Sequence, residues 1–95
     1  MKSEKVLDVV KKIPRGKVST YKELAKTAKT HPRAVGTILH SNKDFSVPCY
    51  RVVRSDGRIG GYNRGVAKKI LLLRRDGSEI KNGKIDLKKY FYRFS

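Results

Sequence analysis

The sequence predicts an α+β, mainly helical fold of the winged helix-turn-helix class, and three observations predict it. Two short amphipathic segments, residues 20–28 and 30–39, are joined by a tight turn, and the second is basic at its start. The β-branched pair Val52 and Val53 precedes an Asp-Gly turn, a pattern typical of a hairpin. Apolar residues elsewhere recur at helical spacing. We expect residues 1–95 to form a single domain, because a chain of this length holds one core.

The first expected element is a helix that begins at Ser3, whose hydroxyl can serve as the N-cap. Its apolar residues lie at helical spacing and form the stripe Val6, Leu7, Val9, Val10 and Ile13. Pro14 ends this helix, and the turn Arg15-Gly16-Lys17 follows.

The helix-turn-helix segment has a capping signal at each helix. Thr20 and Glu23 have the spacing of a capping box, and Thr30 is expected to cap the second helix. Ala34 and Gly36 are small enough to let the backbone of that helix approach a neighbour closely. The neighbour could be another helix or DNA, and the positive charge of the chain favours DNA.

The second half begins with a hairpin and a helix. Residues 55–58 contain Asp-Gly at the centre of a tight turn, and residues 59–62 are expected to return as the second arm of a wing. The returning arm contains glycines but not the lysine of the P-loop motif, so a phosphate-binding P-loop is not indicated. Asn63 is expected to cap a helix that runs through Arg75. The residues expected to face the core are Val66, Ile70, Leu71 and Leu73.

The last segment carries a second turn signal. Asp76-Gly77 closes the preceding helix, and Asn82-Gly83 predicts a hairpin. Leu87, Tyr90, Phe91 and Phe94 then follow at roughly helical spacing, which predicts a terminal segment that covers the core.

Charge decides the expected partner class. The chain has 24 Lys and Arg residues against 8 Asp and Glu residues, a net charge of +16. Such a chain attracts phosphate backbones or anionic membranes. The charge is spread over the whole sequence instead of one amphipathic helix, and no apolar run approaches the ~20 residues of a membrane span, so nucleic acid is favoured. We expect a monomer that does not bind membranes.

The only cysteine, Cys49, cannot form an internal disulfide, which fits an intracellular, reducing compartment. We therefore expect a cytoplasmic, nucleoid-associated or a nuclear location, not secretion. His31, His40 and Cys49 lack the spacing of a zinc finger, so no metal and no cofactor are expected.

The residues on either side of Cys49 could favour a reactive thiol. Pro48 stiffens the chain before it, Val52 and Val53 suit a buried strand after it, and Arg51 brings positive charge nearby. A thiol becomes nucleophilic only as a thiolate, which positive surroundings favour. A lone cysteine can equally be a small buried hydrophobe, because free cysteine is among the most buried residue types.

A series of short motifs occurs in order between residues 6 and 77. The motifs are Ser19-Thr20-Tyr21, Arg33-Ala34-Val35-Gly36, Asn42, Pro48-Cys49-Tyr50-Arg51-Val52-Val53, Gly60-Gly61-Tyr62 and Leu71-Leu72-Leu73-Arg74-Arg75-Asp76-Gly77. Together they resemble the C-terminal, active-site and DNA-binding domain of the O6-alkylguanine-DNA alkyltransferase family. The resemblance implies a suicide repair protein, a methylated-DNA–protein-cysteine methyltransferase. It would flip O6-alkylguanine out of double-stranded DNA and transfer the alkyl group irreversibly to Cys49.

The resemblance also implies three sets of residues. The implied catalytic set is Cys49, Tyr50, Asp76 and Asn42. The implied DNA-binding set is Thr20, Tyr21, Lys22, Arg33, Ala34, Gly36, Arg51 and Ser55. The implied base-binding set is Tyr21, Cys49, Val52, Tyr62 and Asn63.

Individual roles follow from the same resemblance. Arg33 would fill the gap left by the flipped base, and Tyr21 would sit by the phosphate and donate toward the purine ring. Asn42 would lock the recognition helix to the active-site strand. The family uses the minor groove, which would suit the small Ala34 and Gly36.

Recognition of the base would depend on the backbone as well. The carbonyls of Cys49 and Val52 would accept hydrogen bonds from the guanine amine. Asn63 would occupy the loop position that contacts the base oxygen.

The sequence departs from the family pattern in four ways. Tyr50 stands where the family has a histidine, and Asp76 stands where it has a glutamate. The separate N-terminal domain has no counterpart, so the chain would be a free-standing active domain, and the loop over residues 42–49 is slightly short. We expect Tyr50 to donate to Asp76 as a positioning group, because a tyrosine is a poor base at neutral pH. Tyr50 as core packing, with no side-chain base in use, stays an alternative.

Two other functions stay open. One is a non-catalytic DNA-damage sensor of the alkyltransferase-like kind, a group that keeps the fold but lacks the cysteine. Cys49 argues against it. The other is a winged-helix regulator with an inert thiol, which leaves the Pro48–Val53 stretch unexplained.

Overall fold

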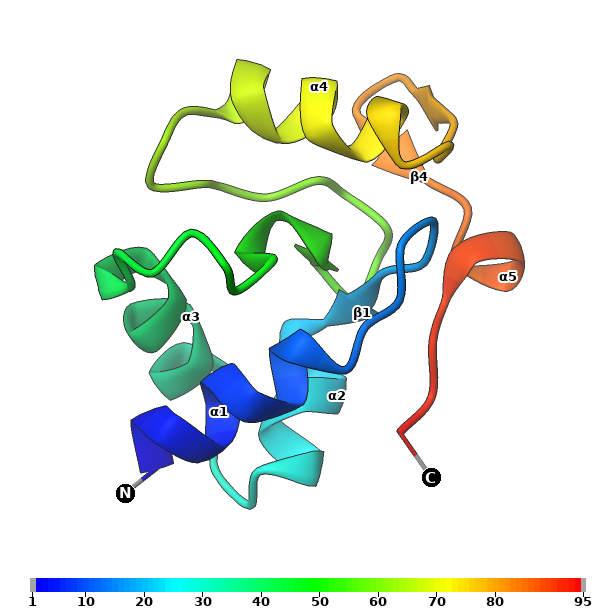
Figure 1. The fold of residues 1–95 in the computed structure, drawn as a ribbon. Coiled ribbons are helices and arrows are strands. Elements are labelled where there is room, and N and C mark those ends of the chain that lie inside the picture. Colours follow the sequence, from blue (N-terminus) through cyan, green and yellow to red (C-terminus); the bar gives the residue numbers. More distant parts are fainter. Residues whose placement is uncertain (1, 95) are drawn as a thin grey trace.

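The computed structural model describes residues 2–94, and helices arranged around a small sheet dominate it (Figure 1). The first helix, α1 (Lys2–Lys11), buries Val6, Val9 and Val10, so the predicted apolar stripe is confirmed. Ser3 lies inside this helix and does not cap it, because the helix already begins at Lys2.

The predicted helix-turn-helix consists of α2 (Tyr21–Thr27) and α3 (Pro32–Ser41). The amide of Glu23 donates to Thr20 Oγ1 at 3.0 Å, which confirms Thr20 as the cap of α2. The cap of α3 is His31, not Thr30: His31 Nδ1 accepts from the amide of Ala34 at 3.2 Å. Thr30 is too early for that role, because its own amide still donates to the carbonyl of Ala25 near the end of α2.

The parallel sheet is very short. Strand β1 (Ser19–Thr20) pairs with β2 (Val52–Val53), so the chain entering α2 lies beside the chain leaving Cys49. Cys49 itself lies in a 3-10 turn, η1 (Cys49–Arg51), and not in the predicted strand. The amide of Arg51 donates back to the carbonyl of Pro48 at 3.0 Å, and this turn ends where the ladder begins at Val52.

The predicted wing is only partly correct. The turn is present, since the amide of Gly57 donates to the carbonyl of Arg54 at 2.9 Å. Residues 59–62 form no strand with the first arm. They run beside a second hairpin, β3 (Ile80–Lys81) and β4 (Lys84–Ile85), and the amide of Ile59 donates to the carbonyl of Gly83 at 3.1 Å. The Asn-Gly turn of that hairpin is confirmed, with both residues at positive φ.

Helix α4 (Val66–Arg75) is rotated relative to the prediction. Its N-cap is Gly65 and not Asn63. Val66 and Leu71 are 46% and 56% exposed, whereas Leu73 and Lys69 are fully buried. Lys69 therefore occupies a core position that the apolar pattern assigned to its neighbours. Asp76 ends the helix as predicted.

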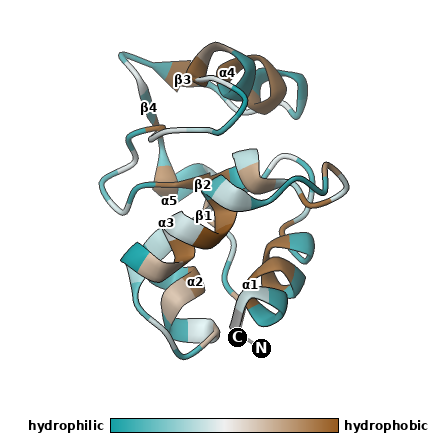
Figure 2. Ribbon diagram, turned by 90° about the vertical axis from the view of Figure 1, so that its left-hand side faces the viewer, coloured by the Kyte–Doolittle hydropathy of each residue, from teal (hydrophilic) through white to brown (hydrophobic). Residues whose placement is uncertain are grey.

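The terminal segment covers the core as predicted. It contains α5 (Leu87–Tyr90), and residue Val18 exchanges backbone hydrogen bonds with it: Val18 N donates to Tyr90 O at 2.9 Å and Tyr92 N donates to Val18 O at 2.8 Å. Figure 2 shows apolar residues both around α1, α2 and β1 and along α4, in agreement with two buried clusters. The α+β, mainly helical class is confirmed.

Candidate functional site

Cys49 lines a cavity of about 400 Å³ between the helix-turn-helix and the loop that precedes α4. The thiol residue is only 7% exposed, so this cavity is its route to a ligand. From α2 and α3 the cavity takes Tyr21, Gly36, Leu39 and His40, and from the loop and the start of α4 it takes Gly61, Tyr62, Asn63, Gly65 and Val66. Segments far apart in the sequence thus line one cavity together with Cys49.

Asn42 is the direct hydrogen-bond partner of the thiol. As the C-cap of α3, it donates from Nδ2 to Cys49 Sγ at 3.3 Å, and also to the carbonyl of Asp44 at 3.0 Å. Burial raises the pKa of Cys49, while the Asn42 bond and the charge of Lys69 oppose that rise. The thiol is therefore protonated at neutral pH. Only two side chains, those of Asn42 and Lys69, favour its thiolate form.

Lys69 is a site residue that the sequence did not predict. Its ammonium donates to the carbonyls of Val52 at 2.7 Å and Gly61 at 3.1 Å, and it lies 6.0 Å from the ring centroid of Tyr21. Burial lowers the pKa of Lys69 to about 7. Lys69 thus connects the strand after the thiol to the loop on the far side of the cavity.

Tyr50, Arg51 and Asp76 form a separate polar group. Tyr50 Oη and Arg51 Nε each donate to Asp76 Oδ2 at 2.9 Å, and Arg51 Nη1 donates to the carbonyl of Ile13 at 2.9 Å. Burial, and then the Asp76 bond, raise the pKa of Tyr50, so it stays a neutral donor. The side chain of Arg51 is 16% exposed and already holds Asp76, which gives it a role inside the protein; its contact with DNA stays a prediction.

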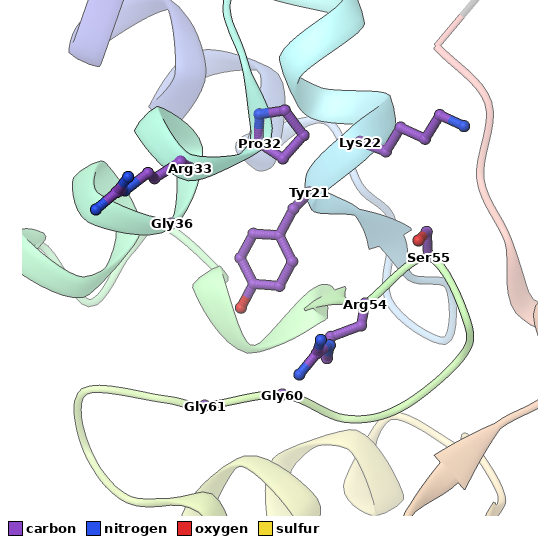
Figure 3. A pocket seen from close by; sticks show the side chains of 9 residues that line it. All are labelled: Tyr21, Lys22, Pro32, Arg33, Gly36, Arg54, Ser55, Gly60 and Gly61. Atoms are coloured by element: carbon purple, nitrogen blue, oxygen red, sulfur yellow. The ribbon is translucent and has the colours of Figure 1, made fainter.

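A larger, more open hollow of about 670 Å³ adjoins the thiol cavity and shares Tyr21, Gly36 and Gly61 with it. In Figure 3 the ring of Tyr21 points from α2 toward the loop of Gly60 and Gly61, with Arg54 beside it and Arg33 on α3 across the hollow. The remaining residues that line it are Lys22, Pro32 and Ser55. Basic side chains and small residues therefore surround the entrance to the thiol cavity.

Two further predicted DNA-binding residues, Thr20 and Ala34, line neither the thiol cavity nor the open hollow. Thr20 is buried and its hydroxyl caps α2, although it reaches a third hollow described below. Ala34 is half-buried. At Gly36 an added Cβ would meet nothing within 4 Å, so the close approach available there is to a ligand and not to a second helix.

Of the five implied base-binding residues, four line the thiol cavity: Tyr21, Cys49, Tyr62 and Asn63. Asn63 Nδ2 donates to the carbonyls of His40 at 3.0 Å and Asn42 at 2.8 Å. Asn63 thus ties the loop to the end of α3. Val52 is fully buried and does not line the cavity, and its carbonyl accepts from Lys69.

Among the described residues, no three His, Cys, Asp or Glu side chains lie close enough to hold a metal ion. No helix in residues 2–94 is both long and apolar enough to cross a membrane.

Comparison with known proteins identifies relatives of the chain. The sequence model of the 6-O-methylguanine DNA methyltransferase DNA-binding domain matches residues 2–78. A bifunctional methyltransferase/endonuclease of Picrophilus torridus is 49% identical over 85 residues, which cover 82% of this chain and 27% of that protein. A methylated-DNA–protein-cysteine methyltransferase of Methanothermobacter thermautotrophicus is 46% identical over 77 residues, which cover 80% of this chain and 44% of that protein.

Solved structures show the same relationship. S. pombe Atl1, in complex with damaged DNA containing O6-carboxymethylguanine, superposes with a TM-score of 0.85 at 32% identity and covers 97% of this chain and 94% of its own. The O6-methylguanine-DNA methyltransferase of Pyrococcus kodakaraensis superposes with a TM-score of 0.73 at 44% identity, covering 79% of this chain and 45% of its own.

The chain thus spans half or less of the length of these curated relatives, but nearly all of Atl1. The matched residues include both helices of the helix-turn-helix, the thiol and the loop across the cavity. The chain belongs to the O6-methylguanine-DNA methyltransferase family and contains the DNA-binding domain of that family.

Proposed function

We propose that the chain repairs alkylated DNA by taking an O6-alkylguanine out of the duplex and accepting its alkyl group on Cys49. The observation that carries this proposal is the thiol itself: Cys49 lines a cavity of about 400 Å³ and accepts a hydrogen bond from Asn42. A base within a duplex is inaccessible to such a recessed atom, so it must be flipped out, which costs a few kcal/mol.

The chemistry balances without a further reactant. Cys49 Sγ attacks the alkyl carbon, the bond from that carbon to the guanine O6 breaks, and its electron pair stays on the purine. The thiol proton ends on the released guanine, so thiol and alkylguanine become thioether and guanine. Burial raises the pKa of Tyr21, which keeps its hydroxyl available as a donor toward the purine.

The residues around the cavity divide the work of binding. Arg33 would fill the space of the flipped base, and Lys22 and Ser55 at the rim would contact phosphates. Tyr62 and Asn63 would form the wall against the base, and the carbonyls of Cys49 and Val52 would accept from its amine.

Lys69 would act as a positioning residue for this reaction. By donating to both Val52 and Gly61 it fixes the two walls of the cavity relative to one another, and its positive charge favours the thiolate of Cys49. It reaches the base only through these groups.

The direct test is the mass of the protein after incubation with a duplex bearing O6-methylguanine. We expect one added methyl group, located on Cys49 by peptide mapping, and tight binding without any added mass for Cys49→Ala. A methyl group on another residue, or an unmodified wild-type protein after long incubation, contradicts the proposed transfer.

A damage sensor is the second candidate function. The observation that favours it is the match to nearly the full length of Atl1, together with the burial that raises the pKa of Cys49. A sensor would bind the O6-methylguanine duplex more tightly than the unmodified duplex and would not change in mass. The same incubation therefore separates the two functions.

Tyr50 provides a milder test of the proposed mechanism. Because its hydroxyl donates to Asp76 and stays neutral, we expect Tyr50→Phe to lower the single-turnover rate modestly, by about two- to fivefold. Tyr50→His, whose pKa of ~6.5 permits proton acceptance, should raise the rate near neutral pH. Equal rates for wild type and Tyr50→Phe across the pH range would show that the hydroxyl has no role.

A further inference from the structure

We propose that the C-terminal segment, residues 87–94, extends the DNA-binding surface and contacts backbone phosphates of the duplex on one side of the lesion. This inference rests on the proposed function, since it assumes that duplex DNA is the ligand. The segment lies beyond the residues that match the family model, which end at residue 78. A contact there would add to what the matched domain provides.

The structural basis is a third hollow, of about 520 Å³, between α2 and the C-terminal segment. Thr20, Lys22 and Lys26 form the wall on the α2 side, and Lys88 and Arg93 stand on the opposite wall. Leu87 and Phe91 also line the hollow and offer apolar contacts suited to sugar groups.

Neighbouring hollows share residues that line them. The thiol cavity and the open hollow share Tyr21, and the open hollow and the third hollow share Lys22 and Ser55. A ligand that delivers a base to Cys49 and lies across Lys22 would therefore reach Lys88 if it continued in that direction. A long, stiff molecule such as a DNA duplex has this property, whereas a single anion does not.

Charge selects the same ligand. Lys22, Lys26, Lys88 and Arg93 are all exposed, and Glu23 is the one acidic residue that lines this hollow. Within residues 2–94, none of these four cations is held in an ion pair. They are therefore available to phosphates, which a duplex presents at one charge per ~1.7 Å of its axis.

The segment is also held in position before any ligand binds. The hydrogen bonds between Val18 and the backbone of Tyr90 and Tyr92 fix it to the chain that enters α2. The guanidinium of Arg93 lies 5.7 Å from the ring centroid of Phe91. A surface that is already ordered loses little conformational entropy on binding.

The test compares two double variants that remove the same charge. Lys88→Gln/Arg93→Gln alters the proposed surface, while Lys5→Gln/Lys12→Gln alters exposed lysines on or just after α1, none of which line the three hollows. Binding to an O6-methylguanine duplex is measured against salt concentration. We expect the log–log slope to become shallower by about 1 to 2 for the first variant, since each phosphate contact contributes about 0.9. The control should retain the wild-type slope within about 0.5.

A second arm uses duplexes shortened on one side of the lesion or on the other. Wild type should lose about tenfold in affinity when one particular side is shortened, and Lys88→Gln/Arg93→Gln should lose nothing further on that side. Equal slopes for the two double variants, or equal sensitivity to both truncations, would overturn the inference while leaving duplex binding intact. Failure of wild type to bind any duplex would instead overturn the proposed function.

Discussion

Replacing Lys69 with methionine is expected to slow the proposed methyl transfer to Cys49 by about 100-fold at pH 7, which corresponds to about 2.7 kcal/mol of lost transition-state stabilisation. Methionine fills a similar volume but cannot donate to the carbonyls of Val52 and Gly61, and it carries no charge to favour the thiolate. The two walls of the thiol cavity would lose their connection, and small errors of position at a reacting atom reduce rates strongly.

The slower transfer should not result from a less stable protein. Burying a lysine costs free energy that burying a methionine does not, so the variant keeps its fold. Burial lowers the pKa of Lys69 from the ordinary 10.5 to about 7 in the folded protein. Between these two values the unfolded chain binds more protons than the folded one, so this group makes wild type more stable as the pH rises from about 7 toward 10.5. Lys69→Met has no such group and should lack this gain.

The check is urea unfolding at pH 6 and pH 9 in the Cys49→Ala background, so that the thiol does not titrate. Between these pH values the protein with Lys69 should gain about 2 to 3 kcal/mol relative to the Lys69→Met variant. The control is Lys68→Met, because Lys68 is an exposed neighbour on the same helix. A pH-independent difference would show that Lys69 does not titrate as the buried environment predicts.

A third measurement isolates the effect on the thiol. The rate of Cys49 alkylation by iodoacetamide, followed against pH, reports the apparent pKa of the thiol. We expect Lys69→Met to raise that pKa, while Lys68→Met leaves it unchanged. A wild-type transfer rate and an unchanged thiol pKa in Lys69→Met would remove Lys69 from the proposed mechanism.

Local signals in the sequence predicted the parts of the fold that depend on few residues. The Thr20 cap and the Asn82-Gly83 turn each need a specific side chain or a positive φ, and both are found where they were expected. Cys49 was placed in a strand because valines follow it. Only Val52 and Val53 pair with β1. The residues before them form η1, in which the carbonyl of Pro48 accepts a hydrogen bond from the amide of Arg51.

The error at α4 has a different cause. The apolar pattern placed Val66 and Leu71 inward, but the neighbours of a helix decide which face is covered, and those neighbours come from distant segments. Lys69 lies three residues after Val66 and four before Leu73, so it interrupts the predicted stripe. That interruption was the one available signal that a lysine is buried there, and its carbonyl partners could not be identified without the fold.

Of the contacts expected in the implied catalytic set, some are present, but the structure arranges them differently. Cys49 and Asn42 do meet, and Tyr50 does donate to Asp76, but these are two separate contacts with no residue in common. The family resemblance implied that Arg51 contacts DNA. Its guanidinium is held inside the protein by Asp76, a nearly buried carboxylate whose second ion-pair partner, Arg15 at 3.6 Å, is itself 74% exposed.

Asp76→Ala is accordingly expected to reduce the free energy of unfolding by about 3 kcal/mol, since it leaves the guanidinium of Arg51 poorly solvated and unpaired. The side chain of Asp76 is 9% exposed and receives hydrogen bonds from Tyr50 and Arg51 at 2.9 Å each. Through the bond from Arg51 to the carbonyl of Ile13, this carboxylate also joins the end of α4 to the chain after α1.

The matched control is Glu79→Ala, which removes a carboxylate from an ion pair with Lys89 whose members are 65% and 60% exposed. That substitution should change stability by less than about 0.5 kcal/mol, because water screens exposed pairs. Urea unfolding of both variants and of Asp76→Ala/Arg51→Met provides the measurement. Removing the unpaired cation as well should recover about 1 to 2 kcal/mol of the loss. If the double variant is no more stable than Asp76→Ala, the loss arises from packing around the carboxylate and not from the stranded charge of Arg51.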